Sequence, residues 1–140
     1  MKLEQCLDEG LIKKDPRAVD RIEKSLEIAE RFLRSAENNL KIEENEMAEI
    51  AAYNSAFHSA RALLFAKGYV ERSHYCLGVA LKCLYGGELL DLIKVFDKIR
   101  VSRHNVQYGG ALVSREEADF VVEFGEDFLR AARSELLNQG

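Results

Sequence analysis

Residues 99 to 110, IRVSRHNVQYGG, concentrate side chains that can bind anions or move protons. If this stretch is helical, Arg100, His104 and Tyr108 follow one line at i, i+4 and i+8, and Arg103 lies beside the same helix end. A planar guanidinium can clamp a phosphate through two hydrogen bonds, and histidine exchanges protons near neutral pH. The same arginines also suit the negative end of a helix dipole, so spacing alone does not choose between phosphate binding and helix termination.

A second group of polar residues lies in the stretch AAYNSAFHSARALLFAKG. Asn54, His58 and Arg61 follow one helical line at i, i+4 and i+7, beside a run of apolar positions. Such a stripe could line a cleft, which makes His58 and Arg61 candidate ligand-binding residues. Each could equally be satisfied by a carboxylate from a neighbouring helix.

The third histidine, His74, follows Ser73, which we expect to cap the N-terminus of a helix. The positive end of a helix dipole lowers the pKa of a histidine there and leaves a neutral imidazole that can accept a proton or a hydrogen bond. A hydrogen bond to the preceding loop is the alternative. We therefore include His74 among the candidate ligand-binding residues.

Composition predicts a single helical domain over residues 1–140, with its core at about 15–138. The chain is 47% hydrophobic and 31% charged with one proline, a balance typical of soluble helical proteins. Its net charge of −4 excludes a global attraction to nucleic acid or anionic membranes. From Lys94 to Arg103, however, four basic residues accompany the single acid Asp97, so a local basic patch is expected.

The cysteines Cys6, Cys76 and Cys83 are odd in number and form no CxxC pair, so we expect free thiols and a cytoplasmic location. Cys76 and Cys83 share one face of a helix, which suits buried thiols better than metal ligands. No acid or histidine cluster has zinc-like spacing, so no metal and no cofactor are expected. The N-terminal residues lack the long apolar run typical of a signal peptide, so we expect none, and no apolar run is long enough to span a membrane.

Apolar periodicity and capping residues predict an all-α fold, an up-and-down four-helix bundle with a short additional N-terminal helix. The expected helices cover about residues 1–9, 16–43, 46–67, 74–85, 88–108 and 115–137. Asp15 with Pro16 marks one helix start, and Ser114 with Glu117 has the spacing of a capping box. No strand is expected.

The last helix carries an i, i+4 row formed by Phe120, Phe124 and Phe128, with a second apolar strip beside it. The row is either part of the core or, because the apolar face is broad, part of a homodimer interface.

Three segments together resemble a known family: YNSAFHSARALLFAKGYVERSH, then SRHNVQYGG, then SREEADFVVEFGEDFLRAARSEL. In this order they resemble the small stand-alone HEPN-domain proteins of prokaryotes, over nearly the whole chain from Asp15. The resemblance implies a helical bundle that pairs as a homodimer, with a polar motif facing a cleft near the dimer interface. It also implies RNA as a ligand, since many HEPN proteins are metal-independent ribonucleases, often toxins paired with a minimal nucleotidyltransferase antitoxin.

The HEPN hallmark is an arginine followed at once by a polar residue and, after four to six intervening residues, by a histidine. Arg103 and His104 match the first two positions, whereas Tyr108 stands where the histidine is expected. Tyrosine, with a pKa near 10, is a poor general base at neutral pH, although it can donate a hydrogen bond or stack on a base.

We therefore expect Arg103, His104 and Tyr108 to bind RNA or a nucleotide with weak or no catalysis. His58, Arg61, His74 and Asn105 are further ligand-binding candidates. The first alternative is a metal-independent endoribonuclease in which two protomers bring Arg103 and His104 into one cleft. The second is a dimeric scaffold whose polar motif only holds the interface together.

Overall fold

A computed structural model describes residues 2–139 of the chain, except for the side chain of Glu88. Its helices are α1 (Leu3–Asp8), the short 3₁₀ helix η1 (Pro16–Arg21), α2 (Ile22–Lys41), α3 (Asn45–Ala66), α4 (His74–Leu84), α5 (Glu88–Gly109) and α6 (Arg115–Gln139). Two short strands, β1 (Ile12–Lys14) and β2 (Tyr69–Glu71), complete the structure. The predicted all-α class is confirmed.

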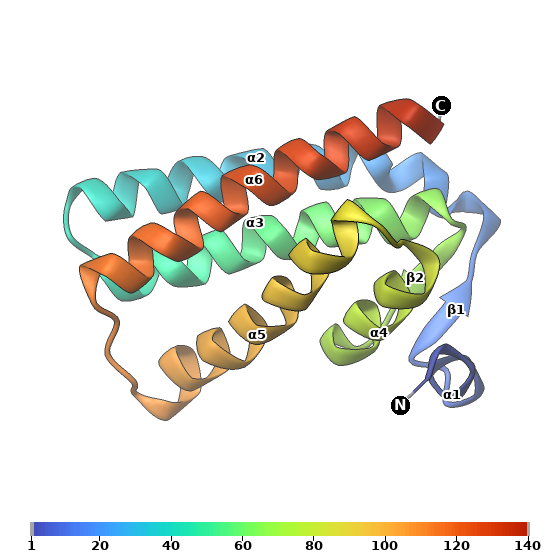
Figure 1. Ribbon diagram of the computed structural model, residues 1–140, viewed down its shortest axis with the longest axis horizontal. Helices are drawn as coiled ribbons and strands as arrows, with labels where there is room; N and C mark the ends of the chain where they lie inside the picture. Colours follow the sequence, from blue (N-terminus) through green and yellow to red (C-terminus); the bar gives the residue numbers. More distant parts are fainter. Residues whose placement is uncertain (1, 140) are drawn as a thin grey trace.

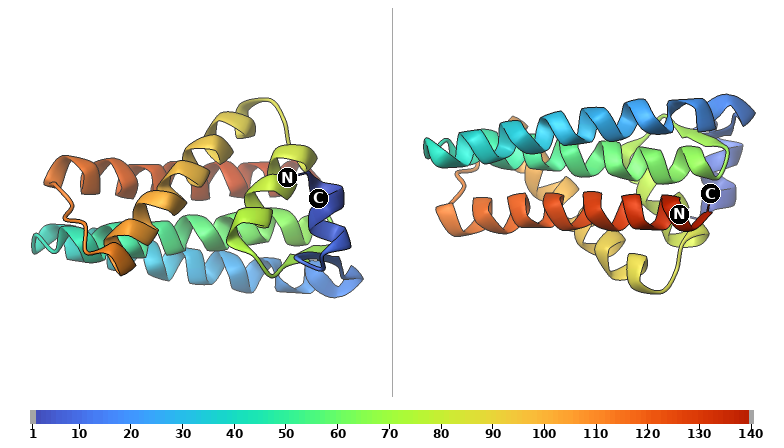
Figure 2. Two further views of the ribbon diagram at one scale, coloured as in Figure 1. Left: turned by 90° about the horizontal axis from the view of Figure 1, so that it is seen from below. Right: turned by 90° about the horizontal axis from the view of Figure 1, so that it is seen from above.

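The long helices α2, α3 and α6 lie alongside one another, and α2 runs in the direction opposite to α3 and α6 (Figure 1). Helix α5 is inclined to these three, and α4, α1 and the two strands gather at one end of the bundle (Figures 1 and 2). This inclination allows α5 to pack on both α3 and α4. Helix α5 thus lies close to residues of two other helices.

Capping residues start the helices where the sequence predicts. The Ser73 hydroxyl accepts a hydrogen bond from the Cys76 backbone N–H at 3.1 Å, and Ser114 does the same for Glu117 at 3.1 Å. The Asp15 carboxylate accepts from the Arg17 N–H, but the turns that follow form the 3₁₀ helix η1, so the α-helix begins at Ile22, later than expected. Gly110, with a φ of 73°, ends α5 in the left-handed conformation that favours glycine.

Helix α3 is the centre of the core because it is covered on nearly every side. Its small residues allow α2 and α6 to approach closely, and Gly125 of α6 lies against the backbone of Ala52. The hydroxyl of Ser55 donates to the Ala29 carbonyl of α2 at 2.8 Å, which satisfies a polar group inside this contact. Within residues 2–139, no helix is both long and apolar enough to cross a membrane.

The phenylalanine row of α6 divides between core and surface. Phe124 and Phe128 are buried, and Phe128 packs against Phe96 of α5. Phe120 is 56% exposed, so this end of the row does not belong to the core of a single chain.

The small antiparallel ribbon of β1 and β2 was not expected. Ile12 pairs with Glu71 and Lys14 with Tyr69, and the Asp15 N–H donates to the Gly68 carbonyl at 2.8 Å beyond the ribbon. Three-residue strands are too short to produce an alternating pattern, and their partners are distant in the sequence. Only the folded chain brings them together.

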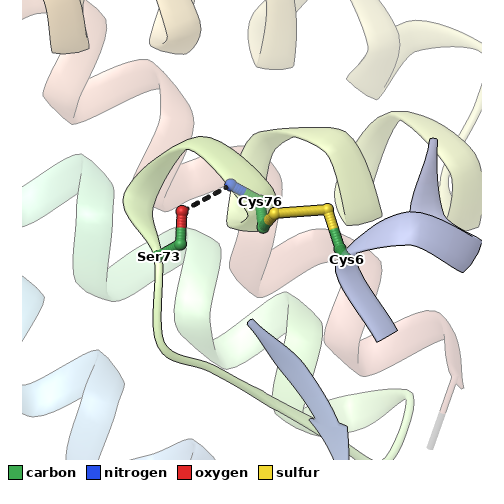
Figure 3. The surroundings of a disulfide bond; sticks show 3 residues. All are labelled: Cys6, Ser73 and Cys76. Atoms are coloured by element: carbon green, nitrogen blue, oxygen red, sulfur yellow. Dashed lines mark hydrogen bonds between the residues drawn. A yellow bond between two sulfur atoms is a disulfide. The ribbon is translucent and has the colours of Figure 1, made fainter. Parts of the chain in front are cut away.

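The expectation of three free thiols is wrong. Cys6 of α1 and Cys76 of α4 form a disulfide across a sequence separation of 70 residues, and both are fully buried (Figure 3). Cys83, expected to be buried, is exposed and free. The disulfide ties α1 to the first turn of α4 and removes one of the reasons for expecting a cytoplasmic location.

Candidate functional site

A polar cleft of about 490 Å³ lies between helices α3, α4 and α5. Most of its lining side chains are polar or charged and come from the second half of α5. The lining residues are Asn54, His74, Arg100, Arg103, His104, Gln107 and Tyr108. Arg103, His104 and Tyr108, predicted as the central residues, therefore face one space together with His74.

Arg103 carries a positive charge that no carboxylate neutralises. Its Cζ lies 4.5 Å from the centroid of the Tyr53 ring, and its Nη1 donates to Gln107 Oε1 at 3.0 Å. Its Nε is buried and has no hydrogen-bond partner, and no ion pair to Arg103 occurs among the described side chains. A half-satisfied guanidinium beside a cleft favours an anionic ligand, because such a ligand would supply the missing acceptors.

Arg100 also lines this cleft, whereas the sequence left open whether it binds phosphate or serves the helix terminus. Its Nε donates to Asp97 Oδ1 at 3.1 Å, and its Cζ lies 5.5 Å from the centroid of the Tyr75 ring. The carboxylate of Asp97 also faces Lys82 Nζ at 3.4 Å. One acid thus serves two cations, so this side of the cleft retains a positive charge.

His74 enters the cleft from the first position of α4, where the Ser73 cap holds it. Its Nδ1 lies 2.7 Å from the Tyr53 hydroxyl, and its ring stacks on Phe57 with centroids 4.1 Å apart. The pKa of His74 is lowered, as expected, but burial is the main cause and the nearby arginines add to it. The ring is therefore neutral near pH 7.

His104 and Tyr108 form the exposed side of the cleft. Their ring centroids are 5.0 Å apart with planes tilted by 48°, and Tyr108 is 66% exposed. Although His104 directly follows Arg103 on the helix, both side chains line the same cleft. Two aromatic faces are thus available beside the arginines.

A family model described as the HEPN domain matches residues 22–135. The chain belongs to the HEPN domain family. HEPN domains are RNA-binding and ribonuclease modules with a helical-bundle fold. No match was found among the curated proteins. The matched segment includes α2 to α6 and hence the entire cleft, whereas α1 and β1, with Cys6, lie before it.

Two predicted ligand-binding residues of this HEPN domain, His58 and Arg61, lie outside the cleft lining. The Arg61 Nε pairs with Glu71 Oε1 at 2.8 Å, so the structural alternative applies to Arg61. His58 stacks on Phe32 and finds no carboxylate, and its Nδ1 is buried without a hydrogen-bond partner. Burial, with the nearby Arg61 charge, lowers the pKa of His58 to about 4.

Asn105, the remaining candidate, is exposed and is not among the residues that line the cleft. Its backbone carbonyl accepts hydrogen bonds from the N–H groups of Gly110 and Ala111. The HEPN domain therefore uses the backbone of this residue to terminate α5.

A buried carboxyl group lies elsewhere under α5, where sequence analysis did not anticipate one. Glu49 of α3 is fully buried, and its Oε2 accepts from the Ser102 hydroxyl at 3.3 Å. Its Oε1 has no partner, and burial, together with Glu117, raises the pKa of Glu49 to about 7. A large share of this carboxyl is therefore protonated at neutral pH.

Sequence analysis missed Tyr53 and Gln107 as site residues and placed Asn54 only in a general polar stripe. Gln107 follows Arg103 by four residues, a spacing from which their hydrogen bond could have been predicted. The sequence pattern indicates a core position for Tyr53. Its hydroxyl has His74 as a hydrogen-bond partner only because α4 packs against α3.

Proposed function

We propose that this HEPN domain binds RNA in the cleft between α3, α4 and α5, with weak or no cleavage. The observation that carries the proposal is the guanidinium of Arg103, which has no carboxylate partner among the described side chains. Its buried Nε lacks a hydrogen-bond partner, and its Nη1 donates to the neutral amide of Gln107. A phosphate is the anion whose geometry suits such a group, and Arg100 adds a second positive charge on the same helix.

The aromatic side of the cleft suits unpaired bases. Tyr108 and His104 are exposed, and their rings can stack on bases of a single strand. Tyr108 stands where the HEPN resemblance leads us to expect a histidine, and a phenol with an ordinary pKa near 10 does not take a proton at neutral pH. The arrangement thus supports binding more strongly than cleavage.

We further propose that the active form is a homodimer. Support comes from large apolar side chains exposed at the end of α5, in the loop after it and at the start of α6. These residues are Val101, Tyr108, Leu112 and Phe120. Scattered apolar residues are ordinary on a surface, but this set lies next to the cleft in sequence and suits a second copy of the chain. A minimal nucleotidyltransferase partner rests on the family resemblance alone.

Metal-independent RNA cleavage is the second candidate function. It is favoured by one observation, that Arg103 and His104 line the same cleft although they are adjacent in the chain. An arginine could stabilise the phosphate while the imidazole transfers the proton.

Titration of a fluorescent mixed-sequence RNA in EDTA tests the proposal. We expect the wild type to bind and Arg103→Ala to bind at least about tenfold more weakly, because a charge-assisted contact is lost. Arg130→Ala removes an exposed arginine of α6 that pairs with Asp127 and does not line the cleft, so its affinity should equal that of the wild type. A mononucleotide competitor distinguishes a nucleotide site from an RNA site.

Three outcomes would overturn this proposal. Cleavage by the wild type that disappears in both Arg103→Ala and His104→Ala would establish the ribonuclease instead. Equal affinity of the wild type and Arg103→Ala would remove the cleft as the binding site. Absence of any RNA or nucleotide binding, with Arg103→Ala only splitting the dimer, would favour a scaffold.

A further inference from the structure

Tyr53 connects two cleft residues that come from different helices. Its hydroxyl lies 2.7 Å from His74 Nδ1 of α4. The Cζ of Arg103, on α5, lies over the Tyr53 ring at 4.5 Å from the ring centroid. Tyr53 itself is only 1% exposed, so its hydroxyl cannot exchange these neighbours for water. One buried phenol therefore fixes the relative position of both side chains.

The direction of the hydrogen bond between Tyr53 and His74 follows from its surroundings. An arginine has no acceptor atom, so the hydroxyl proton cannot point toward Arg103. Within residues 2–139, His74 Nδ1 is the acceptor found for this hydroxyl. Tyr53 must then donate, and a neutral His74 carries its single proton on Nε2.

The charges around His74 support a neutral ring. Arg103 and Arg100 face it from α5 and Arg61 from α3, and all three oppose protonation, while Asp97 of α5 acts on the neighbouring Tyr53. Burial of the ring lowers the pKa of His74 further. None of these groups would make Nδ1 a proton donor.

The position of the His74 ring is also fixed by packing and by its helix. One face stacks on Phe57, and the first turn of α4 is fixed by the Ser73 cap and by the disulfide at Cys76, two residues further along (Figure 3). With Nδ1 occupied by Tyr53, a ligand in the cleft can meet only the N–H side of the imidazole.

We propose that Tyr53 is a positioning residue that holds His74 as a neutral, Nε2-protonated ring, so that His74 donates a hydrogen bond to a phosphate oxygen of RNA. The role of His74 as an RNA contact rests on the proposed function, whereas the tautomer does not. His74 thus adds a third hydrogen-bond donor to those of Arg100 and Arg103. It does not replace the histidine that is expected at position 108 as a general base.

Long-range ¹H–¹⁵N spectra of the imidazole rings test the tautomer directly. The chain has three histidines, so His58→Phe and His104→Ala assign all three signals. We expect His74 to show an unprotonated Nδ1 and a protonated Nε2 at pH 7 to 8, without RNA. A protonated Nδ1, or a doubly protonated ring at pH 7, would overturn the proposal.

Tyr53→Phe keeps the aromatic ring beneath Arg103 and removes only the hydroxyl. We expect the His74 signals to change to a mixture of tautomers and the RNA affinity to fall about 5- to 10-fold, because the donor is no longer fixed. Tyr85→Phe is the matched control, since it removes a buried hydroxyl bonded to the Leu63 carbonyl, away from the cleft. Unchanged His74 signals in Tyr53→Phe would contradict the positioning role.

Substitutions of His74 separate a donor from a base. His74→Ala should lose about 5- to 10-fold in RNA affinity, and His74→Gln should restore most of it, because the amide is a neutral donor near the position of Nε2. Equal weakening in both variants would contradict the donor role. If the expected tautomer is present but no variant alters RNA binding, the proposed function fails and the role of Tyr53 in holding the ring remains.

Discussion

His58 and His74 are two neutral histidines that share a neighbour and serve different regions of the protein. Both rings contact Phe57, and burial lowers the pKa of both. His74 faces the cleft and has Tyr53 as its partner at Nδ1, whereas His58 faces Phe32 and has no partner at its buried Nδ1. The two regions differ in whether their polar groups find partners inside the fold.

The arginines show the opposite pattern. Arg61, beside His58, pairs with Glu71 within the chain, while Arg103, beside His74, contacts Gln107 and Tyr53 but no carboxylate among the described side chains. Buried or half-buried charges need a counter-ion, and a region that supplies none is prepared for a ligand that does. Arg61 is therefore satisfied within the fold, and the charge of Arg103 makes the His74 region the better candidate for function.

The largest expected effect comes from the covalent anchor, which only the His74 region has. Cys6→Ala removes the disulfide to Cys76 and should lower the free energy of unfolding by about 2–4 kcal/mol, measured in urea without reductant. Because the bond lies two residues after His74, the His74 imidazole signals should shift while those of His58 stay unchanged. Cys83→Ala, at the exposed free thiol, should leave both properties unchanged. Equal unfolding curves for the two variants would show that the anchor contributes nothing.

The next effect is a pH dependence that belongs to the His58 region. Because the folded pKa of about 4 lies below the value of the unfolded chain, stability is present above about pH 6.5 and lost as the pH falls toward 4. His58→Phe should avoid this loss, so the variant should gain about 2–3 kcal/mol relative to the wild type over that interval.

Thermal unfolding from pH 7.5 to 4 measures this difference. Glu49 acts in the opposite sense, since its raised pKa makes stability fall as the pH rises toward 7, but this contribution is common to both proteins and cancels. His104→Ala, at an exposed ring, serves as the control and should follow the wild type. Parallel curves for the wild type and His58→Phe would contradict the assignment.

The smallest effect distinguishes the two arginines. Arg61→Ala leaves Glu71, whose side chain is 10% exposed, without its partner and should cost about 1–2 kcal/mol in unfolding free energy with no loss of RNA affinity. Arg61→Ala combined with Glu71→Ala should recover part of that stability. If Arg61→Ala instead weakened RNA binding as much as Arg103→Ala, the two regions would form one site and the comparison would be wrong.

Local signals predicted most of the helices but not every element between them. Ser73, Ser114 and Gly110 act on their immediate neighbours, so helix boundaries at these positions could be read from the sequence. The pairing of Ile12 with Glu71 and the disulfide from Cys6 to Cys76 join segments far apart in the chain. An odd number of cysteines gave no hint of which two would meet.

In the candidate site, too, local spacing could be predicted from the sequence, whereas contacts between separate elements could not. The helical spacing of α5 placed His104 and Tyr108 near one another, because residues four apart share one region of a helix surface. Arg103 directly precedes His104, so only the packing of α5 against α3 and α4 decided that both line one cleft. Spacing also aligned Asn54, His58 and Arg61, and only the packing of α2, α4 and β2 separated their roles. Helical spacing predicts which residues share a helix face. Their burial and their hydrogen-bond or ion-pair partners depend on which elements pack on that face.

The sequence by itself determined the helical class, the main helix boundaries and the arginine-centred motif of α5, since each depends on contacts within a few residues. The tertiary structure alone decided that His74 and Arg103 meet over Tyr53, and that Arg61 is neutralised by Glu71. It also decided that Cys6 is joined to Cys76. These contacts join separate elements whose docking is set by the whole core, and no local pattern encodes which side chains remain without a partner.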